Sequence, residues 1–198
     1  MQIFFPKEED HEIRATILPE VAKKFTDLGI EVLIESGLGE KVFVSDEQYV
    51  DAGATVCKEK KEGFGSADVV CKINKPNQDE IQSLKKNSIY ISFLDPFNER
   101  QIVSDLAAAN VSSISMELVP RITRAQKMDA LSSQANLAGY AAVIEASRTL
   151  SKSFPMMMTA AGTISPARVF VVGVGVAGLQ AIATAKRLGA RVEAFDTR

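Results

Sequence analysis

Histidine is nearly absent from this chain of 198 residues, which contains only His11. Because the pKa of imidazole lies close to neutral pH, histidine is the usual general acid or base in enzymes. A reaction that needs such a group has little support in this sequence. Cysteine is also scarce, and neither Cys57 nor Cys71 has a second cysteine or histidine at metal-ligand spacing. We interpret both as free thiols in a reducing compartment.

An excess of basic residues and long apolar runs are missing as well. The chain has 23 Lys and Arg against 25 Asp and Glu, so its formal net charge is −2. This balance gives no support for a nucleic acid partner. No window reaches about 18 uninterrupted apolar residues, and the amino terminus turns acidic at Glu8, where a signal peptide would be apolar. We expect a cytoplasmic chain without direct membrane insertion.

In the first 120 residues, short β-branched and aromatic runs alternate with segments of helical period. This alternation is typical of parallel βαβ units. The predicted strands are Ile3–Phe5, Glu31–Ile34, Thr55–Cys57, Val69–Lys72, Ser88–Phe93 and Ser113–Glu117. The predicted helices are Pro19–Leu28, Asp46–Ala52, Asp79–Lys86 and Glu99–Ala109. The mixed-charge run Lys58–Gly63 is predicted to be a solvated loop.

The remaining residues have a different pattern. An apolar stripe rich in alanine predicts one long helix from Gln126 to about Leu150. Phe154–Gly162 is predicted to be an apolar loop whose three methionines are packing material. A strand at Arg168–Val172, a glycine turn with a helix over Leu179–Leu188, and a strand at Arg191–Phe195 then complete one βαβ unit, at which the sequence stops.

These segments predict an α/β protein. We expect an amino-terminal Rossmann-like or flavodoxin-like parallel-sheet domain over residues 1–125 and a connecting helix over residues 126–150. Residues 151–198 are expected to be the first βαβ unit of a dinucleotide-binding Rossmann domain. Because two strands and one helix cannot bury both faces of a parallel sheet, we expect the chain to be the amino-terminal portion of a longer protein.

The glycine turn is the strongest chemical signal. Gly173, Gly175 and Gly178 follow an apolar strand and open a helix, and Asp196 ends the next strand. In such a turn the first glycine permits the bend, the second lets a pyrophosphate approach the backbone, and the third allows helix and strand to pack closely. Asp196 would bind ribose hydroxyls and repel a 2′-phosphate, which favours NAD(H), although nearby Arg198 leaves NADP(H) open.

A second informative segment precedes the long helix. Pro120 breaks the preceding strand, so that Arg121 begins a loop. One predicted helix face then carries the polar residues Gln126, Asp129, Ser133 and Asn136, with Ser132 at its flank. From spacing alone, this face is either solvated or suited to holding a nicotinamide carboxamide and its ribose.

Four segments together resemble a known family: Arg121–Asp129, Leu131–Tyr140, Phe154–Gly162 and Gly173–Ala190. They look like the NAD(H)-binding domain I of proton-translocating NAD(P) transhydrogenase, in the form with a split α subunit. The match is dense from about Met116 onward and looser before it.

The resemblance assigns roles to particular residues. It implies that Arg121, Gln126 and Asp129 contact the nicotinamide end of the nucleotide and act in catalysis. It further implies a nucleotide site that contains Ile122, Ser132, Gly173, Gly175, Val176, Ala177, Gly178, Asp196 and Arg198.

The implied reaction is direct hydride transfer from NADH bound here to NADP⁺ held on a partner domain. A membrane-spanning subunit would couple this transfer to proton translocation. Positioning of the two rings is the main task in such a transfer, so the scarcity of histidine is compatible with it. The resemblance also implies a homodimer, peripheral on the cytoplasmic side of the inner membrane through its partner subunits. The chain alone is expected to be inactive.

Two other functions remain open at this point. Arg14 and Lys72 lie in segments that resemble the substrate-binding segments of alanine dehydrogenase, from the same superfamily. However, Ser92–Pro96 lacks the histidine that such a dehydrogenase carries near Asp95. The third possibility is a non-catalytic module that senses NAD(H), because a binding site and a hydride-transfer site share most of their residues.

Overall fold

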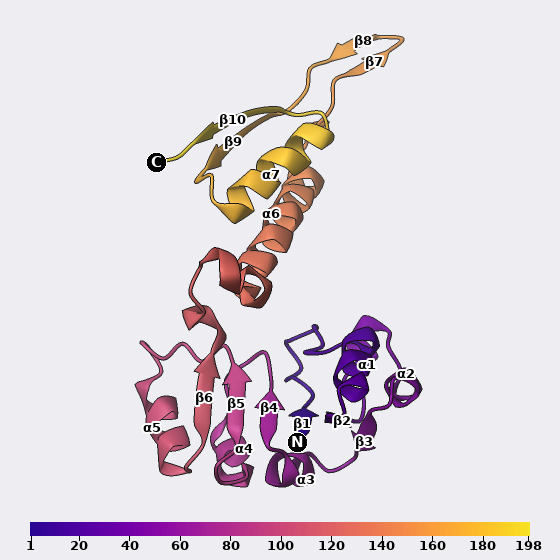
Figure 1. Ribbon diagram of the computed structural model, residues 1–198. Coiled ribbons are helices and arrows are strands. Elements are labelled where there is room, and N and C mark those ends of the chain that lie inside the picture. Colours follow the sequence, from indigo (N-terminus) through magenta and orange to yellow (C-terminus); the bar gives the residue numbers. More distant parts are fainter. The chain divides into compact units, whose positions relative to one another are not determined.

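The chain forms two compact units, Met1–Val119 and Pro120–Arg198, in a computed structural model that describes residues 1–198 (Figure 1). Each unit has its own buried cluster of apolar side chains. No helix in either unit is both long enough and apolar enough to span a bilayer. The finer division at residues 125 and 150 stays a prediction.

The first unit contains a six-stranded sheet in the order β3-β2-β1-β4-β5-β6. All five strand pairs are parallel. The strands are β1 (Gln2–Phe5), β2 (Glu31–Glu35), β3 (Thr55–Cys57), β4 (Val69–Cys71), β5 (Ile89–Ser92) and β6 (Ser112–Ser115). The chain runs outward from β1 to β3 and then continues with β4 on the other side of β1. This doubly wound order confirms the predicted Rossmann-like or flavodoxin-like parallel-sheet domain.

Helices connect these strands, as parallel pairing requires. They are α1 (Pro19–Asp27), α2 (Asp46–Asp51), α3 (Lys60–Ser66), α4 (Gln78–Ser83) and α5 (Arg100–Ala108). Short 3₁₀ helices occur at Glu40–Val42 and Met116–Leu118.

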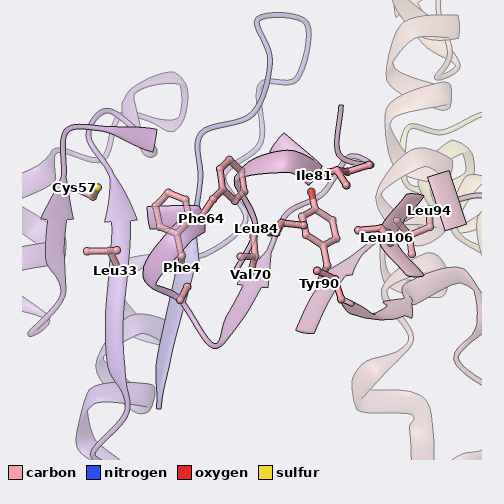
Figure 2. Close-up of a cluster of buried hydrophobic side chains, with 12 residues drawn as sticks. Phe4, Leu33, Cys57, Phe64, Val70, Ile81, Leu84, Tyr90, Leu94 and Leu106 are labelled. Atoms are coloured by element: carbon pink, nitrogen blue, oxygen red, sulfur yellow. The ribbon is translucent and has the colours of Figure 1, made fainter. Parts of the chain in front are cut away.

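Alternating side chains along the strands build a core on each face of the sheet. Phe4, Val70 and Tyr90 point to one face, where they pack with residues of α3, α4 and α5 (Figure 2). Ile3 and Phe5, the neighbours of Phe4 along β1, point to the other face and pack with residues of α1 and α2. Burial on both faces explains the apolar runs of β1, β2 and β4, whereas the edge strand β6 is polar and largely exposed.

Helix α3 corrects the prediction that Lys58–Gly63 is a solvated loop. The helix begins at Lys60 and extends past the charged run to Ser66. Phe64, only 1% exposed, stacks edge-on against Phe4 with ring centroids 5.4 Å apart. Because this contact is tertiary, the charge pattern of the run alone did not reveal the helix.

The second unit contains a long helix and one parallel βαβ unit. Helix α6 (Ala130–Thr149) packs against α7 (Val176–Arg187), which connects β9 (Arg168–Val172) to β10 (Arg191–Phe195). Strands β9 and β10 pair in parallel from Arg168–Arg191 to Val172–Phe195. The expected βαβ unit is therefore present.

The methionine segment differs from its prediction as an apolar packing loop. It forms an antiparallel hairpin of β7 (Met157–Thr159) and β8 (Gly162–Ile164). The three methionines are exposed, with Met158 at 81%, whereas Phe154 is buried against Ala167 and Ala185. The residue types indicated burial, but the turn carries the methionine side chains away from the core of this unit.

Two glycines of α3 provide a matched test of this packing. A Cβ atom on Gly63 would lie 2.4 to 2.6 Å from the Phe4 ring, whereas one on Gly65 would only reach ordinary contact at 3.8 Å. We expect Gly63→Ala to lower the free energy of unfolding by about 1–3 kcal/mol through overpacking. Gly65→Ala should raise it by about 0.5–1 kcal/mol because alanine is the better helix former. Urea unfolding measures both, and changes of the same sign would contradict the packing argument.

Candidate functional site

The glycine turn lies directly between β9 and α7. Gly173 has φ +91°, a conformation that L side chains rarely adopt, and its amide donates to the Phe195 carbonyl of the neighbouring strand at 2.8 Å. A Cβ atom on Gly178 would lie 1.9 Å from the Gly173 carbonyl oxygen. The first turn of α7 therefore packs on the bend itself, and only glycine fits at position 178.

Helix α7 begins at Val176, three residues earlier than the predicted Leu179. Gly175 is its N-cap residue, and the first helical hydrogen bond runs from the Leu179 amide to the Gly175 carbonyl at 2.9 Å. The sequence pattern placed the start too late because Ala177 and Gly178 give no apolar periodicity. The early start leaves the amides of Val176, Ala177 and Gly178 without partners inside the helix. Such amides and the helix dipole favour an anion.

Asp196 lies at the end of β10, beside the turn. One carboxylate oxygen accepts from the Val174 amide at 2.5 Å, and the other accepts from the Arg198 amide at 2.9 Å. These backbone hydrogen bonds, Val174 first, lower the pKa of Asp196 below its usual value. The carboxylate is therefore ionised at neutral pH and is held against the glycine turn.

The polar segment before α6 is a 3₁₀ helix, Thr123–Met128, followed by a helix cap. Asp129 caps α6: one carboxylate oxygen accepts from the Ser132 amide at 2.9 Å and the other from the Ser132 hydroxyl at 2.6 Å. The hydroxyl bond, the amide bond and the positive charge of Arg121 lower the pKa of Asp129. The cap thus orients an anionic group at this end of α6.

The predicted start of the long helix at Gln126 is wrong, since α6 begins at Ala130. Gln126 and Asp129 consequently do not share a helix face with Ser133 and Asn136. Asp129 is the N-cap residue of α6, a position that favours Asp, so the helix begins directly after it. The apolar stripe in the sequence does not mark this boundary. Gln126, Asp129, Ser133 and Asn136 nevertheless line one common hollow.

A hollow of about 500 Å³ brings this polar set together. It is lined by Arg121, Gln126, Asp129, Ser132, Ser133, Asn136 and Val176. Val176 belongs to the first turn of α7, so the hollow joins the polar segment to the glycine turn within the second unit.

A larger cavity of about 690 Å³ shares Arg121, Ser132 and Val176 with that hollow. Its other lining residues are Leu131, Ala135, Ala138, Gly139, Ala142, Val172, Gly173, Gly175, Ala177, Gly178 and Ala181. Most of the predicted site residues thus surround one connected region of the size that ligand sites have. Ile122, Asp196 and Arg198 are outside both linings, and Ile122 is 55% exposed.

Small residues of α6 also line the cavity and were not predicted. Ala135, Ala138, Gly139 and Ala142 face it from one side of the helix. Their spacing of i, i+3, i+4 and i+7 places them on one helix face, a signal that the sequence contained. Small side chains there leave the cavity open.

In the first unit, the two basic residues that resembled a dehydrogenase site are bound to carboxylates. Arg14 contacts Glu12 at 2.6 Å, and this hydrogen bond lowers the pKa of Glu12 to about 2. Lys72 is buried and contacts both oxygens of Glu80 at 2.9 Å. His11 lies on the surface, 3.8 Å from Glu9.

A doubly wound parallel sheet joined to a βαβ unit with a glycine turn defines a class of two-unit nucleotide-binding α/β proteins. Within this class, the chain belongs to the alanine dehydrogenase/PNT family. The model of the family's N-terminal domain matches residues 4–138, and that of its C-terminal domain matches residues 142–198. This match confirms the resemblance noted in the sequence.

Within that family, the chain is more similar to transhydrogenases than to alanine dehydrogenases. The chain is 48% identical over 204 residues to the first of the chains that make up NAD(P) transhydrogenase subunit alpha in Rhodospirillum rubrum. The match covers all of this chain and 53% of that relative. The chain therefore spans about half the length of this relative.

Two solved structures also show greater similarity to a transhydrogenase than to an alanine dehydrogenase. A transhydrogenase from Sinorhizobium meliloti superposes with a TM-score of 0.96 at 46% identity, over all of this chain and 57% of the other. An L-alanine dehydrogenase superposes with a TM-score of 0.89 at 26% identity, over all of this chain and 55% of the other.

The helix cap at Asp129 makes the free energy of unfolding depend on pH. Because its pKa is lowered in the folded state, its contribution is complete above the unfolded pKa of about 3.9 and is lost as pH falls through the folded value. We expect Asp129→Asn, which keeps a good N-cap residue without the charge, to unfold more easily at pH 7. The difference from the wild type should shrink below about pH 4. Urea unfolding across this range measures it, and a pH-independent difference would contradict the assigned cause.

Proposed function

We propose that the chain is the NAD(H)-binding component of a transhydrogenase that transfers hydride directly between NADH and NADP⁺ held on a separate domain. The observation that carries this proposal is the gathering of Arg121, Gln126, Asp129 and Ser132 around a hollow that adjoins the glycine turn. The greater similarity to transhydrogenases than to alanine dehydrogenase supports it.

The residues at the glycine turn fit a dinucleotide pyrophosphate. Cβ atoms on Gly173 and Gly175 would meet nothing within 4 Å, so the backbone borders open space on the cavity side. The amides of Val176, Ala177 and Gly178 supply donors for phosphate oxygens at the start of α7. A side chain at position 175 would occupy the space into which a phosphate must come.

The ribose end of the site is assigned to Asp196. Its ionised carboxylate lies beside the turn, where it can accept hydrogen bonds from ribose hydroxyls and repel a 2′-phosphate. This charge favours NAD(H) over NADP(H). Arg198 lies two residues after Asp196 in the sequence, and Ile122 directly follows Arg121. Both are proposed as peripheral contacts, since neither lines the cavity.

The polar set, which consists of Arg121, Gln126, Asp129 and Ser132, is assigned to the nicotinamide end of the nucleotide. When bound, the nicotinamide supplies a hydride to the second nicotinamide without a protein acid or base at the reacting carbons. Arg121 offers guanidinium donors, Gln126 offers an amide, and Asp129 is held in one orientation by Ser132. Their task is to bind and orient the ring, and correct orientation alone can accelerate a reaction by many orders of magnitude.

The partners of this component are a domain that binds NADP(H) and a membrane-spanning subunit that couples the transfer to proton translocation. The chain would then be peripheral on the cytoplasmic side of the inner membrane, held there by these partners. We also propose a homodimer. The exposed apolar side chains of the β7–β8 hairpin support assembly, because such surfaces usually pack against a partner.

Alanine dehydrogenase is the second candidate, since the family includes it. Its chemistry needs a proton carrier and free cationic groups for the substrate carboxylate. Ser92–Pro96 contains no histidine, and the Lys72 ammonium is already paired with Glu80 in a buried contact. A sensor of NAD(H) without chemistry is the third candidate, and it differs from the first only in lacking a reaction.

Three assays separate these functions. We expect the full-length protein, mixed with an NADP-binding partner domain, to oxidise NADH only when NADP⁺ or an analogue is present. Alanine with NAD⁺ should produce no NADH. NADH binding without either reaction would support the sensor instead, and formation of NADH from alanine would support the dehydrogenase.

The alignment role of the polar set has a kinetic test. We expect Gln126→Asn and Asp129→Asn to slow hydride transfer about 10- to 100-fold, because small displacements of an aligned ring are costly. The dissociation constant for NADH should change less than about threefold, since the phosphate and ribose contacts remain. Stopped-flow transfer and equilibrium titration measure the two quantities. Equal losses in both would remove the distinction between alignment and binding.

A further inference from the structure

Helix α6 comes close to the backbone of α7 at a glycine. Gly139 is one of only two buried residues of α6, the other being Val143. A Cβ atom on Gly139 would lie 2.2 Å from the Ala177 carbonyl oxygen, 2.9 Å from its carbonyl carbon and 3.0 Å from its Cα. All three are backbone atoms, which cannot rotate away as the end of a side chain can. Any side chain at position 139 must therefore separate the two helices.

This contact joins the two ends of the proposed nucleotide site. Ala177 lies in the first turn of α7, between the amides of Val176 and Gly178. Ser132 and Asp129, at the start of α6, lie about 10–15 Å from Gly139 along the helix, at about 1.5 Å per residue. Ser132, Gly139 and Ala177 all line the same cavity. The separation of α6 from α7 at Gly139 thus determines how far the polar set is from the glycine turn.

The residue type itself needs an explanation. Glycine is a poor helix former compared with alanine, and position 139 is in the middle of a helix of 20 residues. The surrounding positions that line the cavity, Ala138 and Ala142, are alanine. Local helix stability would favour alanine at 139 as well. The approach to the α7 backbone is the feature of this structure that requires glycine there.

We propose that Gly139 is a positioning residue, which sets the distance between the phosphate-binding turn and the groups that hold the nicotinamide. This inference rests on the proposed NAD(H) site. A ligand that contacts both ends of the site depends on this distance, and a ligand that contacts only one end does not. The dependence on ligand length separates positioning from a general loss of structure.

The test compares NADH with AMP in the full-length protein. AMP carries one ribose and one phosphate, so it needs only the glycine-turn end. For Gly139→Ala we expect NADH affinity to fall about tenfold or more, because a misplaced contact is costly, while AMP affinity changes less than about twofold. Isothermal titration measures both dissociation constants. The ratio of the two affinities is the decisive quantity.

Two control variants accompany this test. Ala141→Leu adds a larger side chain on an exposed position of the same helix and should leave both affinities unchanged. Val143→Ala removes packing one turn farther along the buried face, so it should lower stability without altering the NADH to AMP ratio. If Gly139→Ala does not fold in buffer alone, both titrations are repeated for this variant and the wild type in sucrose, an excluded osmolyte that stabilises the folded state, and the same selective loss of NADH affinity is expected there.

The outcomes are distinguishable. A selective loss of NADH affinity supports the positioning role. Unchanged NADH affinity, or equal losses for NADH and AMP, in the folded Gly139→Ala variant would overturn it. Failure of the wild-type protein to bind either ligand would instead overturn the proposed nucleotide site.

Discussion

The site depends on one steric constraint, the packing of the α7 backbone against two neighbours without side chains between them. Gly178 lies against the Gly173 carbonyl, and Gly139 lies against the Ala177 carbonyl. These two approaches place the first turn of α7 between the bend and α6. The residues of that turn then line the same cavity as Ser132. Without either approach, the amides of this turn and the polar side chains would no longer border a common space.

The two units differ in what their charged groups do. In the first unit, buried Lys72 and Glu80 satisfy each other, and Lys60 also contacts Glu80 at 2.8 Å. A buried charge needs an oppositely charged partner because its desolvation alone is costly. In the second unit, Asp129 borders the hollow and Asp196 lies beside the glycine turn, and backbone amides hold both carboxylates. Groups fixed in this way remain available to a ligand, so the candidate chemistry lies in the second unit.

Much of the fold could be predicted because the central strands of the first sheet are buried on both faces. All six strands of that sheet were predicted within a few residues, and the central ones carry uninterrupted apolar runs such as Val69–Cys71. Helix α3 and the β7–β8 hairpin were missed. Packing of Phe64 on Phe4 decides the first, and the course of the chain around an exposed turn decides the second. Neither interaction is local in the sequence, so residue type and spacing could not reveal them.

The sequence by itself determined the parallel βαβ pattern, the glycine turn and the set of polar residues before α6, because periodicity, glycine spacing and residue chemistry are local properties. Only the tertiary structure decided that Gln126 and Asp129 meet Val176 around one hollow, and that Gly139 touches Ala177. These features arise from contacts between segments roughly 40 to 50 residues apart. Such contacts depend on how backbones approach in space, which a linear pattern of residues does not specify.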